Sequence, residues 1–232
     1  MVLSAIVHPP RNLIMTSPIS KTSDDLQKRE KKVQNRQPID LTQFVESAKT
    51  LKRKEMYEKH PREMARYKSA YLDIKACFQE KRSWKTEVIC VIGDHGSGKK
   101  HWCKTNSIDA YCVTKARGGW WNEYDGHETV IIEDFAGWIK IGELLQLTDR
   151  YDLMLNIRGG QEVNFVAKKL FITSVCDPTG WWQNTRNKPV KWLMAKLIGR
   201  IDRVIKVENT EAKECNVEEW KCAINDKLNR TE

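Results

Sequence analysis

The sequence lacks the features that mark several large classes of protein. No apolar run approaches the length of a membrane span, and the first apolar stretch is short and interrupted by His8-Pro9-Pro10, so neither a membrane protein nor a secretory signal is expected. Its seven cysteines include no C-x-x-C pair, which argues against a zinc site and for reduced thiols in a cytosolic or nuclear protein. No internal repeat is present. These absences leave a globular domain as the expectation.

Positive charge is in excess, with 40 Lys and Arg against 31 Asp and Glu and a formal net charge of +9. Such a balance favours an anionic partner, either nucleic acid or nucleotide, although a solvated basic surface has the same composition. Residues 1–38 combine prolines, Ser/Thr clusters and the run KREKKVQNR. They are expected to form a disordered basic tail, in which the run is either a nucleic-acid or nuclear-import patch or merely solvated.

Residues 39–83 are expected to be helical. Asp40 is a plausible N-cap, and the helix that it opens should end at His60-Pro61, where Pro61 can begin the next helix. In that second helix an apolar stripe recurs at three- and four-residue steps through Met64, Tyr67, Tyr71, Ile74 and Phe78. The stripe fits a helix that packs on its own domain and equally a collar for self-association.

From residue 84 the pattern becomes α/β, and residues 84–206 are expected to form one domain followed by a tail or helix at 207–232. Short apolar runs typical of buried parallel strands occupy 88–92, 129–132 and 170–173. A helix is expected at 141–147, a hairpin with a Gly159-Gly160 turn at 153–165, and a helix and a strand after 186. In an open parallel sheet the ligand site lies at the carboxyl ends of the strands.

The first of these strands runs directly into GDHGSGKK, residues 93–100. Glycines allow the backbone N–H groups to wrap a phosphate, and a lysine after them can reach the outer phosphates from the start of a helix. The candidate nucleotide-binding residues are Gly93, Gly96, Ser97, Gly98, Lys99 and Lys100.

Two further polar segments complete the candidate site. Glu133 and Asp134 close the second strand, as carboxylates do in metal-assisted phosphoryl transfer, where one holds Mg²⁺ and the other polarises the attacking water. Arg158 at the hairpin tip, with Lys168 and Lys169 downstream, could grip a phosphate backbone.

These segments in this order resemble the superfamily 3 helicase domain of replication-initiator (Rep) proteins from circular single-stranded DNA viruses, the circovirus type above all. The resemblance covers roughly residues 60–206 and rests on RSWKTEVICVIGDHGSGKKHW, GGWWNEYDGHETVIIEDFAGW, LLQLTDRYDLMLNIRGG and FVAKKLFITS. It implies an AAA+-like P-loop fold with a parallel sheet, a hexameric ring, and translocation on single-stranded DNA driven by ATP with Mg²⁺. It also implies action in a host nucleus if the protein is viral, and otherwise in the cytoplasm.

Matched to the family's motifs, GDHGSGK is the Walker A loop and Lys99 its phosphate lysine. Glu133-Asp134 takes the place of Walker B, and Arg158 that of the basic residue of the pore hairpin. Arg200, in GRID, stands where the family has an arginine that can act as a finger on a neighbouring subunit.

Two departures from the family fall on catalytic positions. Lys100 replaces the Ser or Thr whose hydroxyl ligates Mg²⁺, and an ammonium has no lone pair with which to bind a metal. It can instead pair with Glu133, Asp134 or a phosphate oxygen, so ATP binding is expected to survive with hydrolysis weakened.

The second departure is Val175, which replaces an asparagine at the end of the third strand. A valine makes no side-chain hydrogen bond, and Ser174 and Asp177 are the neighbours that could compensate. The histidines include no His-x-His, and YCVTK at 111–115 fits a strand better than a nucleophile motif, so no nicking activity is expected.

Three interpretations therefore stay open: an ATP-dependent DNA helicase with impaired catalysis, a Rep-derived module that binds nucleotide, DNA or its own kind without turnover, and a P-loop-like fold without a ligand.

Overall fold

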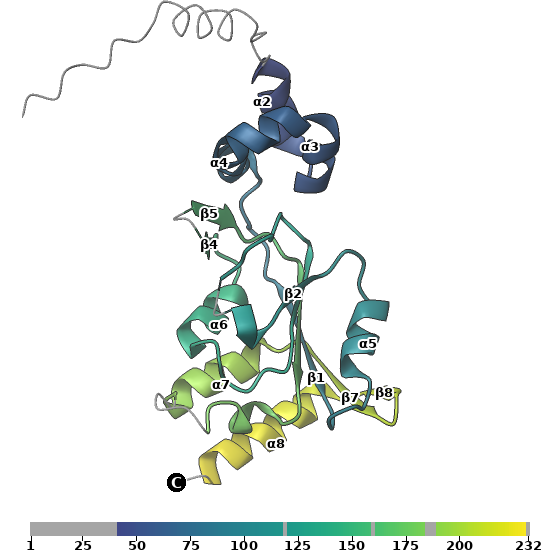
Figure 1. Cartoon of the computed structure of the whole chain (residues 1–232). Coiled ribbons are helices and arrows are strands. Elements are labelled where there is room, and N and C mark those ends of the chain that lie inside the picture. The colour runs from purple at the N-terminus through teal and green to yellow at the C-terminus, as the bar shows by residue number, and fades with distance from the viewer. Residues whose placement is uncertain (1–40, 118–119, 159–160, 184–188, 231–232) are drawn as a thin grey trace, which may run out of the picture. The chain divides into compact units, whose positions relative to one another are not determined.

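The computed structural model describes residues 41–117, 120–158, 161–183 and 189–230, and the expected basic tail at 1–38 lies outside them. None of the described helices combines the length and apolar character that crossing a bilayer requires. The fold is α/β with a mostly parallel sheet, as expected (Figure 1).

The N-terminal helical region contains three helices, α2 (Leu41–Thr50), α3 (Arg53–Lys59) and α4 (Pro61–Phe78). The single helix expected before His60 is thus divided. The division has its own cap, because the backbone N–H of Lys52 donates to the Glu55 carboxylate (2.8 Å) at the start of α3. Pro61 opens α4, as expected.

The apolar stripe of α4 packs largely within this chain. Met64 and Tyr71 are buried, and the Tyr71 hydroxyl donates to Asp125 Oδ1 (2.9 Å). Phe78, at the end of the stripe, is 60% exposed and lies 4.8 Å from the Lys49 ammonium. The structure therefore gives most of the stripe an internal partner, and the self-association collar stays a prediction.

The central sheet has the strand order β2-β3-β6-β1-β7-β8, in which only β8 is antiparallel to its neighbour. The strands are β1 (Glu87–Ile92), β2 (Tyr111–Val113), β3 (Thr129–Ile132), β6 (Lys169–Ser174), β7 (Arg203–Glu208) and β8 (Glu211–Glu214). The three strands expected from apolar runs are β1, β3 and β6, and the YCVTK segment supplies β2. Because β6 lies between β1 and β3, the three strand ends carrying the candidate motifs are adjacent.

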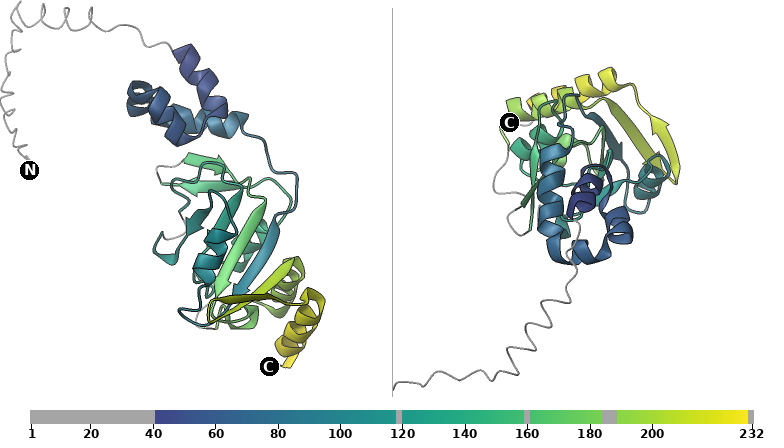
Figure 2. Two further views of the ribbon diagram at one scale, coloured as in Figure 1. Left: turned by 90° about the vertical axis from the view of Figure 1, so that its right-hand side faces the viewer. Right: turned by 90° about the horizontal axis from the view of Figure 1, so that it is seen from above.

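Both faces of the sheet are covered, which explains why the strands are unbroken apolar runs. On β1, Ile89 and Val91 pack with Cys103 of α5 (Lys99–Thr105), while Val88 and Cys90 belong to the larger core on the other face. That second face is covered by α6 (Ile141–Leu147) and α7 (Lys191–Arg200), as Figures 1 and 2 show.

The hairpin is formed by β4 (Met154–Ile157) and β5 (Gln161–Asn164), which pair antiparallel; its expected Gly159-Gly160 turn lies outside the described residues. Asn164 Nδ2 donates to the Ala76 carbonyl of α4 (2.9 Å). In the C-terminal part, α7 and β7 are followed by the strand β8, which was not expected, and by α8 (Val217–Arg230), which lies where a tail or helix was expected. Two short 3-10 turns, η1 (Lys115–Arg117) and η2 (Pro178–Gly180), complete the fold.

Candidate nucleotide-binding site

The loop between β1 and α5 has the backbone that its glycines predict. Gly96 and Gly98 have φ of 79° and 95°, a conformation that side-chain-bearing residues rarely adopt. A Cβ atom on Gly93 would lie 2.1 Å from the Val207 carbonyl oxygen of β7, so only glycine fits there. The Thr210 N–H, in the turn after β7, donates to the Ser97 carbonyl (3.1 Å) and holds the loop from outside.

Lys99 is a buried cation held by uncharged oxygens. Its side chain is on the first turn of α5, and its ammonium donates to the carbonyls of Gly93 (2.7 Å) and Asp94 (2.6 Å). Lys99 is only 6% exposed, and among the described residues no carboxylate forms an ion pair with it. A buried charge without an opposite charge is costly, so this ammonium favours an anionic ligand in the loop.

Lys100 lies beside Lys99 in the chain but is paired differently. Its ammonium is 2.5 Å from Glu133 Oε2, so of the two carboxylates that the sequence left open Glu133 is the partner. The hydrogen bond to Glu133 raises the pKa of Lys100 above its ordinary value. Since Glu133 is buried at the end of β3, this pair joins the first turn of α5 to the strand that carries both candidate carboxylates.

Asp134, the second carboxylate, is exposed at the same strand end. Its backbone has φ of 47°, and its N–H donates to Thr173 Oγ1 of β6 (2.9 Å). Thr173 is itself buried, at 2% exposed. Its hydrogen bond therefore holds the unusual backbone conformation of Asp134 from the neighbouring strand.

A cavity of about 330 Å³ joins these groups, a volume within the range of small-molecule sites. Its walls include the predicted residues Gly96, Gly98, Lys99, Lys100, Glu133 and Asp134. They also include His95, His101 and Thr173, which the sequence reasoning did not propose. Thr173 was missed because its role depends on β6 lying next to β3, whereas His95 lies within the glycine-rich loop and His101 directly follows it.

In the described part of the loop after β6, residues 175–183, no group replaces the missing asparagine. Val175 is 40% exposed. Ser174 is fully buried; its hydroxyl donates to the Phe135 carbonyl (2.7 Å) and accepts from the Trp181 indole (3.0 Å). Asp177 accepts from the Thr179 backbone (3.0 Å) and pairs with Lys227 of α8 (2.7 Å). Both neighbours are thus engaged in structural bonds.

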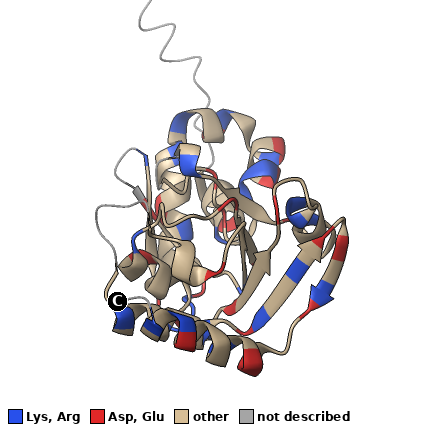
Figure 3. Ribbon diagram, turned by 90° about the horizontal axis from the view of Figure 1, so that it is seen from below, with Lys and Arg blue, Asp and Glu red and all other residues tan. Residues whose placement is uncertain are grey.

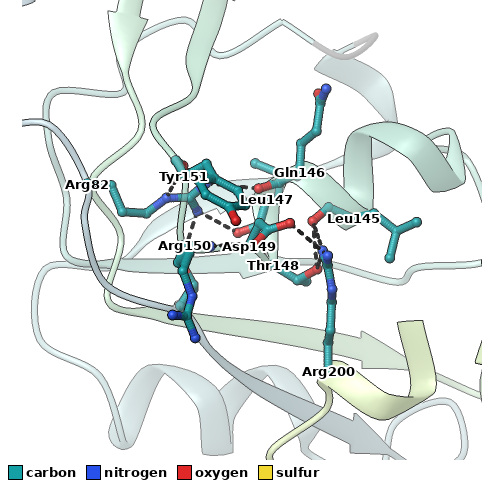
Figure 4. A network of polar contacts seen from close by, with 10 residues as sticks. Arg82, Leu145, Gln146, Leu147, Thr148, Asp149, Arg150, Tyr151 and Arg200 are labelled. Carbon is teal, nitrogen blue, oxygen red and sulfur yellow. Dashed lines mark hydrogen bonds and ion pairs between the residues drawn. The ribbon is translucent and has the colours of Figure 1, made fainter. Parts of the chain in front are cut away.

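Arg200 lies outside the cavity and is bound within the chain (Figure 4). Its guanidinium donates to the Leu145 carbonyl, to Thr148 Oγ1 (3.3 Å) and to Asp149 Oδ2 (2.7 Å), and its side chain is 17% exposed. In this single chain the expected arginine finger therefore ties α7 to the end of α6, and its role toward another subunit stays a prediction.

The candidate DNA-binding residues Arg158, Lys168 and Lys169 do not line the cavity. Arg158 is exposed next to β4, and its backbone N–H donates to Asn122 Oδ1 (2.9 Å). Lys168 pairs with Glu128 (2.6 Å), and Lys169 is exposed at the first residue of β6, which is the opposite end of that strand from Thr173 and Ser174.

The C-terminal helix α8 carries charges of both signs. Along α8, basic residues alternate with acidic ones (Figure 3): Glu218, Glu219, Lys221, Asp226, Lys227 and Arg230. This helix consequently offers no surface of a single sign to a nucleic acid.

Comparison with known proteins gives these features a context. Residues 89–176 match the family model described as RNA helicase. The chain is 43% identical over 103 residues to the replication-associated protein of goose circovirus, across 44% of this chain and 34% of that protein. It is 37% identical over 119 residues to the replication-associated protein of porcine circovirus 2, across 51% of this chain and 38% of that protein. The replication-associated protein of human associated cyclovirus 1 is 41% identical over 103 residues, across 41% of this chain and 36% of that protein. The chain thus matches little more than a third of the length of these relatives.

Proposed function

Because this chain contains a superfamily 3 helicase domain of the circovirus Rep type, we propose that it binds ATP in the loop between β1 and α5 and acts on single-stranded DNA in rolling-circle replication. We further propose that ATP hydrolysis is restrained by Lys100. By similarity to viral replication proteins, the expected place of action is the nucleus of a host cell.

The observation that carries the proposal is the buried Lys99 ammonium without a carboxylate partner. The triphosphate of ATP would supply the missing negative charge, and the cavity around the loop has room for it. Backbone N–H groups of the loop would bind further phosphate oxygens.

The residues present do not make a good site for the Mg²⁺ that the family implies. The position of the ligating hydroxyl carries the Lys100 ammonium, which cannot bind a metal, and that ammonium engages the Glu133 carboxylate. Lys100 instead brings one positive charge to the phosphates. Glu133 is the group that could accept a proton from an attacking water, and its Oε2 is already occupied by the hydrogen bond from Lys100.

The proposed DNA contact is the β4–β5 hairpin, where Arg158 is exposed and can meet a phosphate backbone. Lys168 and Lys169 are proposed as secondary contacts. A hexameric ring belongs to the same proposal, and in it Arg200 would have to leave Asp149 in order to reach a neighbouring nucleotide.

A second candidate function is a module that binds nucleotide and DNA, or its own kind, without turnover. The pairing of Lys100 with Glu133 favours it, as does the engagement of Ser174 and Asp177 in structural bonds around Val175. The two candidates share ATP binding and differ in hydrolysis.

ATP binding is tested by titrating a fluorescent ATP analogue into the wild type, Lys99→Met and Lys104→Met. Lys104 is the matched control, because it is an exposed lysine on the same helix and does not line the cavity. Loss of a charge-assisted contact worth about 2–3 kcal/mol should weaken binding by Lys99→Met by about 30- to 150-fold. Equal affinity of all three proteins would refute nucleotide binding in this loop.

Hydrolysis by the wild type, measured with and without single-stranded DNA, then separates the two candidates. Slow turnover that DNA stimulates supports the helicase. ATP binding without any turnover supports the binding module.

A further inference from the structure

A second cavity, of about 360 Å³, lies away from the phosphate loop and has no part in the proposed nucleotide chemistry. Residues of α6, of β4 and of the segment after η1 form its walls. Three tryptophans line it, Trp120, Trp121 and Trp138, together with the polar side chains of Glu143, Gln146 and Asn156. A cavity of this size with flat aromatic walls and a few polar groups has the composition of a site for a small planar ligand.

The tryptophans provide aromatic rings on which a planar ligand can stack and an indole N–H that can donate a hydrogen bond. Trp120 is 38% exposed, whereas Trp121 is 7% exposed and held by the ring of Tyr111, which stacks on it at 5.9 Å. The indole N–H of Trp138 is buried and has no hydrogen-bond acceptor among the described residues. A buried donor without an acceptor costs free energy, so a small movement of the ring that brings this N–H to an acceptor atom on a flat ligand would be stabilised.

The polar walls restrict the ligand further. Glu143, when ionised, only accepts hydrogen bonds, and the Gln146 amide can both donate and accept. An aliphatic side chain would leave the Trp138 N–H unpaired, and a phosphate inside the cavity would meet the Glu143 carboxylate. A nucleobase has ring-edge acceptors for the Trp138 N–H, N–H donors for Glu143 and a flat face for the tryptophan rings.

The cavity is also placed next to the hairpin. In β4, Leu155 and Ile157 are buried, whereas Met154 and Asn156 are exposed. Met154 and Asn156 both line the cavity. Arg158 follows Asn156 by two residues, about 7 Å along an extended chain. A base in the cavity would therefore leave its backbone phosphate outside, within reach of a cation.

We propose that this cavity binds a nucleobase, supplied by single-stranded DNA that runs along β4 toward Arg158. The inference rests on the proposed DNA-binding function and adds to it a stacking site on Trp120 and a hydrogen bond from Trp138. Bases with an exocyclic amine can donate to Glu143 and should bind more tightly than thymine.

The test measures fluorescence anisotropy of two labelled oligonucleotides of about twelve units, one of deoxyadenosine and one with the same backbone and no bases in its middle part. The full chain is compared with Trp120→Ala, Trp138→Phe and the control Trp192→Ala. Trp192 is 65% exposed on α7 and does not line the cavity. Trp138→Phe keeps a ring that can pack on Phe135 and removes only the N–H donor and part of the indole.

Trp120→Ala should weaken binding of the base-bearing oligonucleotide about tenfold and Trp138→Phe about threefold, with Trp192→Ala within twofold of wild type. With the abasic oligonucleotide the four proteins should agree within twofold. If the wild type binds the base-bearing oligonucleotide and the cavity variants bind it equally well, the inference is wrong and DNA binding stands. If the wild type binds neither oligonucleotide, the proposed DNA-binding function is wrong, and the inference that rests on it is wrong as well.

A separate arm distinguishes DNA from free nucleotide as the source of the base. Adenosine monophosphate is titrated into Lys99→Met, with tryptophan fluorescence as the readout. Quenching that Trp120→Ala removes in this background would show that the cavity also accepts a free nucleotide. Absence of quenching at millimolar concentration, together with equal DNA binding by the cavity variants, would overturn the assignment of a nucleobase.

Discussion

The phosphate loop and the end of α6 both hold cations in the protein interior, but they satisfy these charges differently. In the loop, Lys99 is bound by two backbone carbonyls and has no carboxylate partner in the described structure. At the end of α6, Arg82 and Arg200 donate to helix-end carbonyls and flank Asp149 (Figure 4). The second region contains a carboxylate counter-charge, Asp149, which pairs with Arg200, whereas the loop has no carboxylate partner for Lys99 among the described residues and would gain one from an anion.

This difference indicates which cations are available to a ligand. A cation that has a carboxylate of the same chain beside it contributes to stability, and its removal should change unfolding more than binding. A buried cation without a counter-charge should do the opposite. Lys100 lies between the two cases, because its partner Glu133 is itself a candidate catalytic group.

The largest change in stability is expected from Arg82→Ala. Arg82 is 3% exposed and donates to Leu147 O (2.9 Å), Gln146 O (2.9 Å) and Tyr151 O (2.9 Å). Its loss removes a donor from all three carbonyls, of which Gln146 O keeps the Asp149 N–H (3.2 Å), and should lower the free energy of unfolding by about 4 kcal/mol. Urea denaturation measures this, with the exposed neighbour Lys81→Ala as control; a loss below about 1 kcal/mol would contradict the structural role.

Gly93→Ala should disturb the loop itself. The new Cβ would lie 2.1 Å from the Val207 carbonyl oxygen, so β1 and β7 must separate at this end. We expect the free energy of unfolding to fall by about 2–3 kcal/mol and the ATP affinity about tenfold.

The matched control for Gly93→Ala is Gly142→Ala in α6, where a Cβ would have no neighbour within 4 Å. Since alanine favours a helix, this variant should be more stable than wild type by about 0.5–1 kcal/mol. Equal effects of the two substitutions on ATP affinity would show that the close approach at Gly93 is unimportant.

Thr173→Val should have a smaller effect, because it keeps nearly the same volume and removes two hydrogen bonds of the hydroxyl, one accepted from the Asp134 N–H (2.9 Å) and one donated to the Ile132 carbonyl (3.4 Å). The Asp134 N–H would lose its acceptor and the strained backbone its support, at a cost of about 1–2 kcal/mol. Thermal unfolding and ATP hydrolysis are measured on the same samples. A variant as stable as wild type would mean that Asp134 keeps its conformation without Thr173.

The smallest effect is expected at Asp149. Burial raises the pKa of this carboxyl, but the Arg150 N–H and the charge of Arg200 outweigh burial and hold the pKa below the ordinary value of 3.8. A depressed pKa contributes stability that is present above the ordinary pKa and is lost as the pH falls through the folded one.

Asp149→Asn should therefore lower the stability at pH 7 by about 1 kcal/mol, and the difference from wild type should shrink as the pH falls below about 4. Denaturation curves at pH 7, 5 and 3 measure it. A difference that does not change with pH would exclude the ion pair as its cause.

The sequence predicted the elements whose signal is local. The apolar runs at β1, β3 and β6 and the helix at 141–147 were confirmed, because strands covered on both faces are apolar throughout. The edge strand β8 was missed because its four residues, Glu211–Glu214, are all exposed and carry no apolar alternation. The break between α2 and α3 was missed because it is marked by a hydrogen bond from the Lys52 backbone N–H to the Glu55 side chain, rather than by a proline or glycine.

The same distinction applies to the site. The glycine-rich loop and the paired carboxylates could be proposed from short motifs, and the structure brings six of these residues to one cavity. Contacts between distant segments could not be proposed from the sequence. The bond from Asp134 to Thr173 and the support of Ser97 by Thr210 depend on strand order. The pairing of Arg200 with Asp149 likewise depends on how α7 packs near α6.

The central claim, that Lys99 binds ATP while Lys100 restrains its hydrolysis, is tested most directly by single-turnover ATP hydrolysis in wild type and Lys100→Ser, with ATP affinity measured on the same samples. Serine restores a hydroxyl at this position and frees the Glu133 carboxylate. The account predicts that ATP affinity changes by less than about threefold while the hydrolysis rate rises at least about tenfold, or 1.4 kcal/mol. Equal hydrolysis rates in the two proteins would contradict it.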